Sequence, residues 1–517
     1  MGYASLYFLL KTGLHYGHYL NLHWLPNLLL ALLAFWPLPR PGWQRLRAWL
    51  FWPLALVLVY HDSLLPSPQR IWTQLGAVGG FSQDYLQELL GRLVSPVALV
   101  TLLATVLLYT LLRHWLRFAT WALAGILSVP LMGMLGTAGS TGAPAPAVGA
   151  SAANALGPQE AALQQFYQSE HQRRVVFAAP TQAPAFDLIV LHVCSLSWDD
   201  LDFVNLRNAP LFKRFDLVFS HFNSAASYSG PASVRLLRGN CGQTSHAQLY
   251  KGVDASCYTF PALEKLGYET HGLLNHTGAY DNFGKGVEQA AGLNLRHLDD
   301  NHGARVQMQS FDGSPIYDDL DLLSQWWGQH QRKGRAPLAL YYNTISLHDG
   351  NRVPGLASRS SLDTYKPRLQ KLLSDFDRFV SQLEASGRPV VLMLVPEHGA
   401  SLRGDKVQIA GMREIPDPKV TLVPAAVKLI GMPKTAAASA PVLIQQETSY
   451  FGLNALLADL LHDNPFAAQG LPLALRLEHL PSTPYVAEND DVVMLRQADG
   501  RYALKSSDGT WVAFGAP

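Results

Sequence analysis

Five long apolar runs in the first 136 residues constrain this chain more than any other feature of its sequence. Each run approaches the roughly 20 residues that an α-helix needs to cross the hydrocarbon core of a bilayer. The runs are Tyr3–Leu20, Pro26–Leu38, Trp49–Leu65, Pro96–Leu112 and Ala119–Leu135. Lys11, His15 and His18 interrupt the first run, but no basic start or small-residue cleavage site before the next run marks a signal peptide. We therefore predict an α-helical transmembrane bundle of about five spans over residues 1–136.

Arginines in two loops indicate how these spans are oriented. Arg40, Arg45 and Arg47 lie between the second and third runs, and Arg113 and Arg117 lie between the fourth and fifth. An excess of Arg marks the cytoplasmic side of a membrane, so five spans with both loops inside place everything after about residue 136 outside. We therefore expect a multi-pass membrane protein with the rest of the chain outside, which in a bacterium means the periplasm or the cell surface.

The composition changes after the last apolar run. Residues 137–159 are rich in Ala, Gly, Pro and Ser without any period, which is typical of a linker. Residues 160–517 read as a globular domain, and the net charge of +1 gives no field that would attract nucleic acid, so we expect no such partner. Leu86–Val94 has helical amphipathicity and is interpreted as a short surface helix of the membrane domain, with contact to lipid headgroups as the alternative.

Several short apolar runs in the second part of the chain end in polar residues. Such runs suit fully buried strands, and helical stretches such as Leu362–Ser386 separate them, so we predict an α/β domain with a largely parallel sheet covered on both faces. Ligands bind beyond the carboxyl ends of the strands in such sheets. The runs and the residues after them are Leu188–Val193 with Cys194, Val390–Val395 with Glu397 and His398, and "PLALYYNTISLHDG" with His348 and Asp349.

Ser229 lies in "SYSGPASVRLLRGN", where a serine-rich turn runs into a predicted helix. A hydroxyl just before a proline in the first helical turn lies where the free N–H groups of the helix point. Ser229 is therefore either a helix cap or a nucleophile. Ser227 could cap the same turn. Taken singly, Cys194, Glu397 and His398 have ordinary explanations as a core cysteine and loop residues. Together they supply the donors of a tetrahedral Zn²⁺, with the Ser229 oxygen as a fourth, and a helix N-terminus favours a phosphate.

The sequence contains three cysteines, all in the predicted periplasmic part. In an oxidising compartment two of them should pair. Cys241 and Cys257 flank a polar loop of about 15 residues, so we predict a local bridge between them, worth roughly 3 kcal/mol in the chain-entropy treatment of disulfides. Cys194 is then the free thiol, either buried in the core or bound to a metal.

These motifs carry a resemblance. The chain resembles the alkaline phosphatase superfamily in four features: Cys194 at a strand end, "FNSAASYSGPASVRLLR", "LHDG" and "EHG". More narrowly, it resembles the phosphoethanolamine transferases, which have a membrane bundle of about five helices and a periplasmic catalytic domain. The lipid-A-modifying members have a Thr nucleophile, a carboxylate in place of Cys194 and several disulfides, and this chain departs from them on all three counts. It is instead similar, over essentially its whole length, to the cellulose phosphoethanolamine transferases encoded beside bacterial cellulose synthases.

The resemblance implies a role for each of these residues. Ser229 would be the nucleophile, and it would hold one zinc per chain together with Cys194, Glu397 and His398. His348 would bind the phosphate or shuttle a proton. Tyr228 and Arg413 would line the site and stabilise phosphate charge. The implied reaction moves phosphoethanolamine from phosphatidylethanolamine to glucose hydroxyls of cellulose through a covalent Ser229 intermediate. Cellulose synthase subunits in the inner membrane are the implied partners.

Two other functions stay open on the sequence alone. One is a phosphoglycerol transferase or another phosphodiesterase of the same superfamily that acts on a cell-envelope glycan. The other is a non-catalytic membrane scaffold of a polysaccharide-secretion complex, for which Ser229 would be dispensable. A sulfatase is disfavoured, because no Cys/Ser-x-Pro-x-Arg stretch surrounds Cys194 or Ser229.

Overall fold

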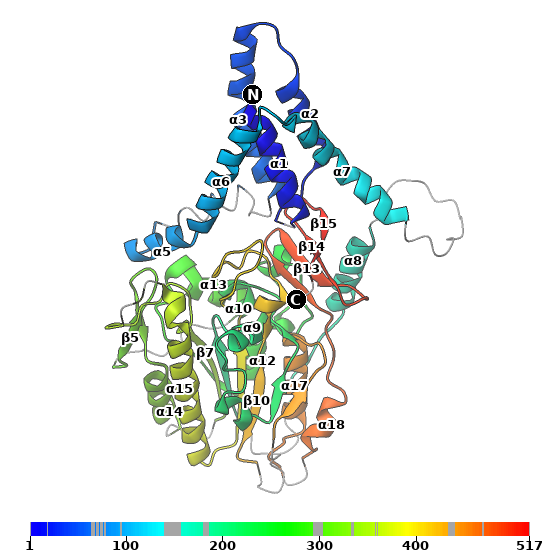
Figure 1. The fold of residues 1–517 in the computed structure, drawn as a ribbon. Coiled ribbons are helices and arrows are strands. Elements are labelled where there is room, and N and C mark those ends of the chain that lie inside the picture. The colour runs from blue at the N-terminus through cyan, green and yellow to red at the C-terminus, as the bar shows by residue number, and fades with distance from the viewer. Residues whose placement is uncertain are drawn as a thin grey trace, which may run out of the picture. The chain divides into compact units, whose positions relative to one another are not determined.

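The structure is a computed structural model, shown in Figure 1, that describes most of the chain. The described residues are 2–17, 19–63, 68, 72, 76, 79–93, 96–138, 157–178, 186–292, 303–331, 336–356, 358, 360–432, 440–467 and 470–515. The chain divides into two compact units. The first comprises residues 1–68, 89–155 and 405–409, and the second comprises residues 69–88, 156–404 and 410–517.

The first unit is helical, and all five apolar runs form helices. These are α1 (Gly2–Tyr16), α2 (Trp24–Phe35), α3 (Pro41–Asp62), α6 (Pro96–Leu112) and α7 (Phe118–Ala138). Within the described residues no single helix combines the length and the hydropathy of a membrane span, whereas Gln83–Arg92 and Pro96–Leu112 meet the criterion only as a pair bent by 42°.

Lys11, which interrupts the first apolar run, is accommodated by a buried ion pair. Its Nζ lies 2.8 Å from Asp62 Oδ2 at the end of α3, and it also donates to Asn27 Oδ1 at 2.8 Å. All three side chains are almost fully buried, and a buried charge is tolerated only when it is paired and hydrogen-bonded. These three polar side chains therefore join α1, α2 and α3 instead of facing outward.

The second unit is built on a mixed sheet whose seven strands, among the described residues, run in the order β11-β2-β10-β8-β1-β7-β4. The predicted α/β class is confirmed. The strands are β1 (Asp187–Val193), β2 (Leu217–Phe219), β4 (Glu269–Leu274), β7 (Leu338–Thr344), β8 (Val390–Pro396), β10 (Ala426–Ile430) and β11 (Val442–Ile444). The neighbours β8, β1, β7 and β4 are parallel, as predicted, but β10 runs antiparallel to both β8 and β2.

Alternate residues of the central strand β1 supply two separate cores, one on each face of the sheet. Ile189, Leu191 and Val193 pack in one core with α15 (Tyr365–Ala385) and α14 (Asp319–His330), whereas Leu188 and Val190 pack in the other with α17 (Tyr450–His462). Because both faces are covered, β1 is apolar on both of them, apart from Asp187 at its start and the buried His192, and its apolar residues are nearly continuous in the sequence. The predicted helix 362–386 consists of a 3₁₀ turn followed by α15.

Shorter elements complete this unit. The helices are α8 (Pro158–His171), α9 (Trp198–Phe203), α10 (Ser229–Leu237), α11 (His246–Leu249), α12 (Thr259–Lys265), α13 (Phe283–Ala291), α16 (Pro418–Thr421) and α18 (Leu473–Leu477). Two short antiparallel pairs are formed by β3 (Phe222–Asn223) with β9 (Leu422–Val423) and by β5 (Val306–Gln309) with β6 (Pro315–Tyr317). A C-terminal antiparallel sheet contains β12 (Val486–Asn489), β13 (Val492–Arg496), β14 (Tyr502–Lys505) and β15 (Trp511–Phe514).

Candidate active site

The register of two central strands brings the predicted metal ligands together. In the parallel pair β1–β8, Val193 lies opposite Pro396, so Cys194 and Glu397 follow at the same edge of the sheet. The Glu397 N–H donates to the Val193 carbonyl at 2.9 Å, and the Cys194 N–H donates to the Thr344 carbonyl of β7 at 2.9 Å. Two apolar runs nearly 200 positions apart thus deliver a thiol and a carboxyl to one point.

The side chains that follow these strands converge with Ser229. Cys194 Sγ lies 3.4 Å from Ser229 Oγ and 3.8 Å from His398 Nε2, and Ser229 Oγ lies 3.4 Å from His398 Nε2. Glu397 Oε2 is 3.7 Å from His398 Nε2. The donor atoms of Cys194, Glu397 and His398 all lie within 4.8 Å of one another, and the three side chains are buried.

These residues fit a tetrahedral cation such as Zn²⁺. Bond lengths of about 2.0–2.3 Å to Zn²⁺ put neighbouring donors roughly 3.5 Å apart, and the separations here are close to that. Within the described residues Glu397 Oε2 is buried without a hydrogen-bond partner, which is a costly arrangement unless something positive completes it. A thiol, a carboxylate and an imidazole also select a soft metal over Mg²⁺ or Ca²⁺.

Further contacts orient the two ligands supplied after β8. His398 Nδ1 lies 2.9 Å from the Gly399 carbonyl oxygen, so its N–H donates to that oxygen. The other ring nitrogen, Nε2, therefore faces Cys194 and Ser229 without a proton. Asn343 Nδ2 donates to Glu397 Oε1 at 2.5 Å, and His192 Nδ1 lies 3.5 Å from the same oxygen. Sequence reasoning missed Asn343 and His192, although each is a polar residue inside a buried strand and was therefore visible.

The glycine of "EHG" is required by close packing. A Cβ on Gly399 would come within 2.5 Å of Ser197 Oγ and 2.9 Å of Asp200 Oδ2. Asp200 is fully buried, forms a capping box with Ser197 at the start of α9, and accepts from the Ala400 N–H at 2.7 Å. This carboxylate therefore anchors the loop that carries His398.

Ser229 is not the N-cap of its helix. Tyr228 occupies that position with extended backbone angles (φ −135°, ψ 150°), and Ser229 is the first residue of α10. Its Oγ points to Cys194 and His398. The prediction that Ser227 caps the same turn is wrong, because its buried hydroxyl donates to the Arg413 carbonyl at 2.7 Å. Ser227 therefore positions the backbone of Arg413 and is no neutral control for Ser229.

A cavity of about 500 Å³ opens in front of Ser229 and is also lined by Tyr228, His348 and Arg413. Arg413 Nη1 donates to Ser195 Oγ at 3.1 Å, and the guanidinium lies 5.6 Å from the centre of the Tyr228 ring. Within the described chain, the buried Nε of Arg413 has no hydrogen-bond partner. His348 Nδ1 donates to the Asp349 carbonyl at 2.6 Å. The structure thus gathers all seven predicted site residues in one place, with a guanidinium suited to phosphate oxygens.

Burial controls the charges of this cluster. Desolvation raises the pKa of Cys194 to about 12, reinforced by the nearby Glu397 carboxylate, and desolvation also raises the pKa of Glu397 to about 7. Desolvation, together with the Arg413 charge, lowers the pKa of His348 to about 4, so its imidazole is neutral at pH 7. Burial thus disfavours the charged forms of a thiol and a carboxyl at one point, and a bound divalent cation would favour the ionised form of both.

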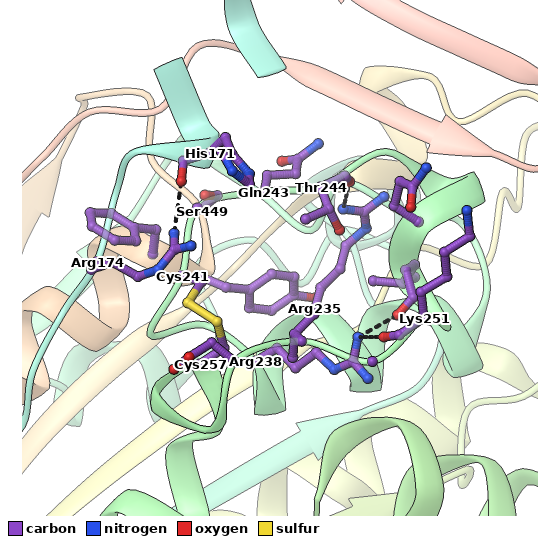
Figure 2. Close-up of a pocket in the computed structure, with 18 residues that line it drawn as sticks. His171, Arg174, Arg235, Arg238, Cys241, Gln243, Thr244, Lys251, Cys257 and Ser449 are labelled. Atoms are coloured by element: carbon purple, nitrogen blue, oxygen red, sulfur yellow. Dashed lines mark hydrogen bonds between the residues drawn. A yellow bond between two sulfur atoms is a disulfide. The ribbon is translucent and has the colours of Figure 1, made fainter. Parts of the chain in front are cut away.

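The last turn of α10 borders a second cavity, of about 510 Å³, shown in Figure 2. Arg235 of the helix and Arg238, its C-cap residue, line this cavity. Both are held by backbone carbonyls: Arg235 Nη1 donates to Thr244 at 2.8 Å, and Arg238 Nη1 donates to Lys251 at 2.9 Å. These bonds fix the loop that follows α10.

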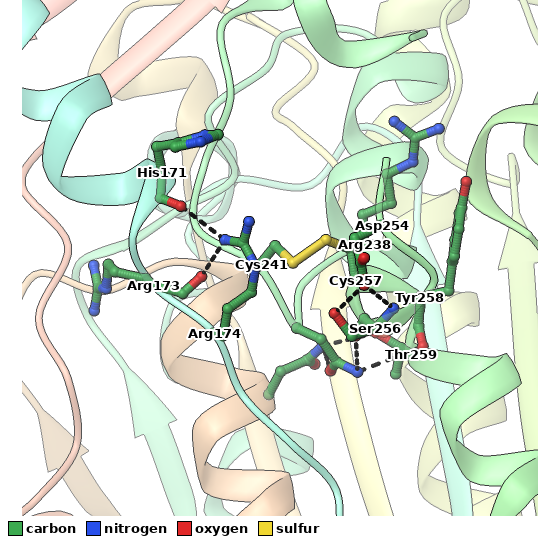
Figure 3. The surroundings of a disulfide bond; sticks show 12 residues. His171, Arg173, Arg174, Arg238, Cys241, Asp254, Ser256, Cys257, Tyr258 and Thr259 are labelled. Carbon is green, nitrogen blue, oxygen red and sulfur yellow. Dashed lines mark hydrogen bonds between the residues drawn. A yellow bond between two sulfur atoms is a disulfide. The ribbon is translucent and has the colours of Figure 1, made fainter. Parts of the chain in front are cut away.

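The predicted disulfide closes the same loop. Cys241 and Cys257 are bonded, with Cα atoms 5.0 Å apart (Figure 3). Cys194 is the free, buried thiol. Within the loop enclosed by the bridge, Asp254 caps a 3₁₀ turn by accepting from the Ser256 N–H at 2.8 Å. The bridge therefore ties the segment after α10 to the start of α12.

Reducing this bridge is expected to lower the free energy of unfolding by about 3 kcal/mol, because the loop of some 16 residues regains its chain entropy. Denaturant unfolding of the full chain in detergent, with and without reductant, measures the change. A Cys241→Ser/Cys257→Ser variant should show the lower stability without reductant and no further response to it. Peptide mapping that found Cys194 in any bridge would contradict the assignment of its thiol to the metal site.

Comparison with known proteins places the chain in a family. Its sequence matches the profile "Cellulose biosynthesis protein BcsG N-terminal domain" over residues 4–131 and that of the BcsG C-terminal domain over residues 145–511. Two curated relatives, both named "Cellulose biosynthesis protein BcsG", come from Escherichia coli K12 and Salmonella typhimurium LT2. Each is 36% identical over 99% of this chain and 95% of the relative.

Solved structures similar to this one have much lower identity. A Vibrio parahaemolyticus protein of the alkaline phosphatase superfamily is 13% identical, with a TM-score of 0.49, over 69% of this chain and 91% of that one. The lipooligosaccharide phosphoethanolamine transferase A from Neisseria meningitidis is 12% identical, with a TM-score of 0.42, over 83% of this chain and 94% of that one. The family profiles and the curated relatives decide the assignment, and the chain belongs to the BcsG family of cellulose biosynthesis proteins.

Proposed function

We propose that this protein transfers phosphoethanolamine from phosphatidylethanolamine to glucose hydroxyls of bacterial cellulose, with Ser229 as the covalent carrier and one zinc per chain. It acts from the inner membrane, anchored by residues 1–136 and joined through the linker 137–159 to a periplasmic catalytic domain, residues 160–517. Cellulose synthase subunits are its partners. The names of its curated relatives support a role in making cellulose.

One observation carries the proposal. Ser229 Oγ lies 3.4 Å from both Cys194 Sγ and His398 Nε2, at the N-terminus of α10 and facing a cavity with Arg413. A hydroxyl beside metal-type donors, a helix N-terminus and a guanidinium is the combination that phosphoryl transfer uses, because the attacking oxygen and the phosphate charge are both stabilised.

The transfer takes place in two displacements. Ser229 Oγ gives up its proton and forms a bond to phosphorus, the bond from phosphorus to the diacylglycerol oxygen breaks, and that oxygen takes up a proton. In the second step a glucose hydroxyl attacks the same phosphorus and loses its proton, and the bond to Ser229 Oγ breaks as the serine regains its hydrogen. Arg413 binds the phosphate oxygens throughout, and neutral His348 binds the phosphate or moves the proton at its Nε2.

Cys194, Glu397 and His398 would hold the zinc beside Ser229. When bound, the metal lowers the pKa of a hydroxyl and balances the negative charge of its ligands. Because one covalent carrier serves both steps, a lipid donor and a polymer acceptor can use the same cavity in turn.

The identity of the donor tests this function. Incubation of the full chain with phosphatidylethanolamine in detergent, without acceptor, should release diacylglycerol and add the mass of one phosphoethanolamine group to the peptide that contains Ser229. Phosphatidylglycerol serves as the matched donor and should give no adduct. An adduct of phosphoglycerol instead would make the protein a phosphoglycerol transferase, and a chain that forms no adduct with either lipid would contradict the covalent mechanism.

A further inference from the structure

Two side chains from a short segment that lies between two apolar helices in the sequence are buried in the second unit. Helix α5 (Gln83–Leu93) begins in this segment, and its residues up to Glu88 belong to the second unit. Tyr85 is 7% exposed and Glu88 is 8% exposed. The sequence predicted a surface helix of the membrane domain here, with contact to lipid headgroups as the alternative. The burial of these two side chains shows that this part of α5 packs against protein.

Tyr85 contacts the loop that carries His348. Its hydroxyl donates to Asp349 Oδ2 at 3.0 Å, across 264 positions of sequence. The backbone carbonyl of the same Asp349 accepts the bond from His348 Nδ1 at 2.6 Å. One residue therefore receives both the Tyr85 hydroxyl and the imidazole N–H that fixes the orientation of the His348 ring.

Glu88 secures the other end of this loop. Its carboxylate accepts from Arg352 Nη2 at 2.5 Å, from Ser360 Oγ at 2.6 Å and from the Ser361 N–H at 2.9 Å. Ser361 Oγ in turn donates to Asp349 Oδ1 at 2.5 Å. Tyr85 thus contacts one oxygen of the Asp349 carboxylate directly, and Glu88 is linked to the other oxygen through Ser361.

Aromatic packing leaves little space around this contact. The Phe311 ring lies 5.9 Å from that of Tyr85 and 4.9 Å from that of His348, measured between centroids. Gly350 has φ +81°, and a Cβ there would come within 2.5 Å of Phe311 Cβ and 2.9 Å of the Tyr85 ring. The residue after Asp349 must therefore be glycine for Tyr85 to approach.

We infer that Tyr85 and Glu88 are positioning residues of the catalytic site: the segment that precedes α6 holds Asp349, and through it sets the orientation of the His348 imidazole toward the phosphate. This inference rests on the proposed function of the cavity at Ser229. The catalytic site is then not confined to the chain after residue 159, because it includes a segment from within the N-terminal 136 residues.

Tyr85→Phe in the full chain tests the inference, because it removes one hydroxyl and leaves the ring packing. The loss of a hydrogen bond to a charged group corresponds to a rate decrease of about tenfold or somewhat more. We therefore expect kcat for transfer to fall about tenfold, while KM for phosphatidylethanolamine stays within about twofold of the wild-type value. Tyr167→Phe is the matched control, because the Tyr167 hydroxyl has no hydrogen-bond partner among the described residues and belongs to a different core. Its kcat should equal that of the wild type. Both variants should stay folded, because the loss of one hydrogen bond lowers the melting temperature of a domain this large by only a few degrees.

A double variant separates positioning from plain stabilisation. If Tyr85 acts through the imidazole, Tyr85→Phe should cost nothing further in a His348→Ala background, whereas independent effects would multiply. Glu88→Gln should reduce kcat in the same manner. Glu160→Gln is its control, because it loses the ion pair with Lys505 and weakens the bond from Trp511 Nε1, and neither of these partners lines the cavity at Ser229. Wild-type kcat in Tyr85→Phe, or multiplicative effects with His348→Ala, would overturn the inference while Ser229→Ala stayed inactive. Transfer by Ser229→Ala would instead overturn the proposed function itself.

Discussion

Ser229→Ala is expected to fold normally and to lose phosphoethanolamine transfer by several orders of magnitude. The Ser229 hydroxyl lies between Cys194 Sγ and His398 Nε2, and the N-cap position of α10 belongs to Tyr228. Even the loss of a true cap would cost only about 0.5–2 kcal/mol of stability, which leaves a domain of this size folded. Removing the attacking atom instead removes the covalent route, and the remaining binding groups supply only residual catalysis.

The measurement is the initial rate of diacylglycerol release from phosphatidylethanolamine, with circular dichroism as the check on folding. Ser229→Thr keeps a hydroxyl at the same position and should retain part of the activity. Ser381→Ala is the control for serine removal as such, because Ser381 is exposed on α15 and bonds only to groups remote from the cavity, such as Arg214. A Ser229→Ala protein that still released diacylglycerol at an appreciable rate would rule out the covalent mechanism.

The sequence predicted that the proposed metal ligands converge, because a simple rule relates apolar runs in the sequence to one edge of a sheet. Continuous apolar runs mark buried parallel strands, and the residues that follow such strands meet at one edge of the sheet. That rule placed Cys194, Glu397 and His398 together before any distance was known, and the structure brings them within 4.8 Å. The rule does not identify a strand that runs against the others, which is why the antiparallel β10 was not anticipated.

Contacts made by loops could not be predicted in the same manner. The serine-rich turn offered three hydroxyls, and residue preference alone did not show that Ser227 donates to the Arg413 carbonyl, or that Tyr228 takes the cap position. The bond from Tyr85 to Asp349 spans 264 positions and depends on how one loop folds over another. Arg413 was found only through the resemblance, because an arginine in a loop has no periodicity that would mark it.

Cys194→Ala is expected to lose the bound zinc, and transfer activity with it, while the domain stays folded. Cys194 supplies the only thiol of the cluster, and without the metal its pKa is raised by burial to about 12, so the thiolate forms only in the presence of a strong positive charge. Removing that ligand leaves Glu397 and His398, which are too few to hold zinc against dilution. The side chain is small, so the stability loss should be of the ordinary size for one core substitution, about 0.5–3 kcal/mol.

Elemental analysis of purified protein measures this directly, with one zinc per chain expected in the wild type and less than about a tenth of that in Cys194→Ala. Because the thiol must lose its proton to bind, the wild type should release zinc to a chelator more readily as the pH falls. Cys241→Ser/Cys257→Ser is the matched control: it removes sulfur of the disulfide and should keep its zinc. Two zinc ions per wild-type chain would require a second complete ligand set, whereas full zinc in Cys194→Ala would place the metal away from Ser229 and remove the basis for its activation.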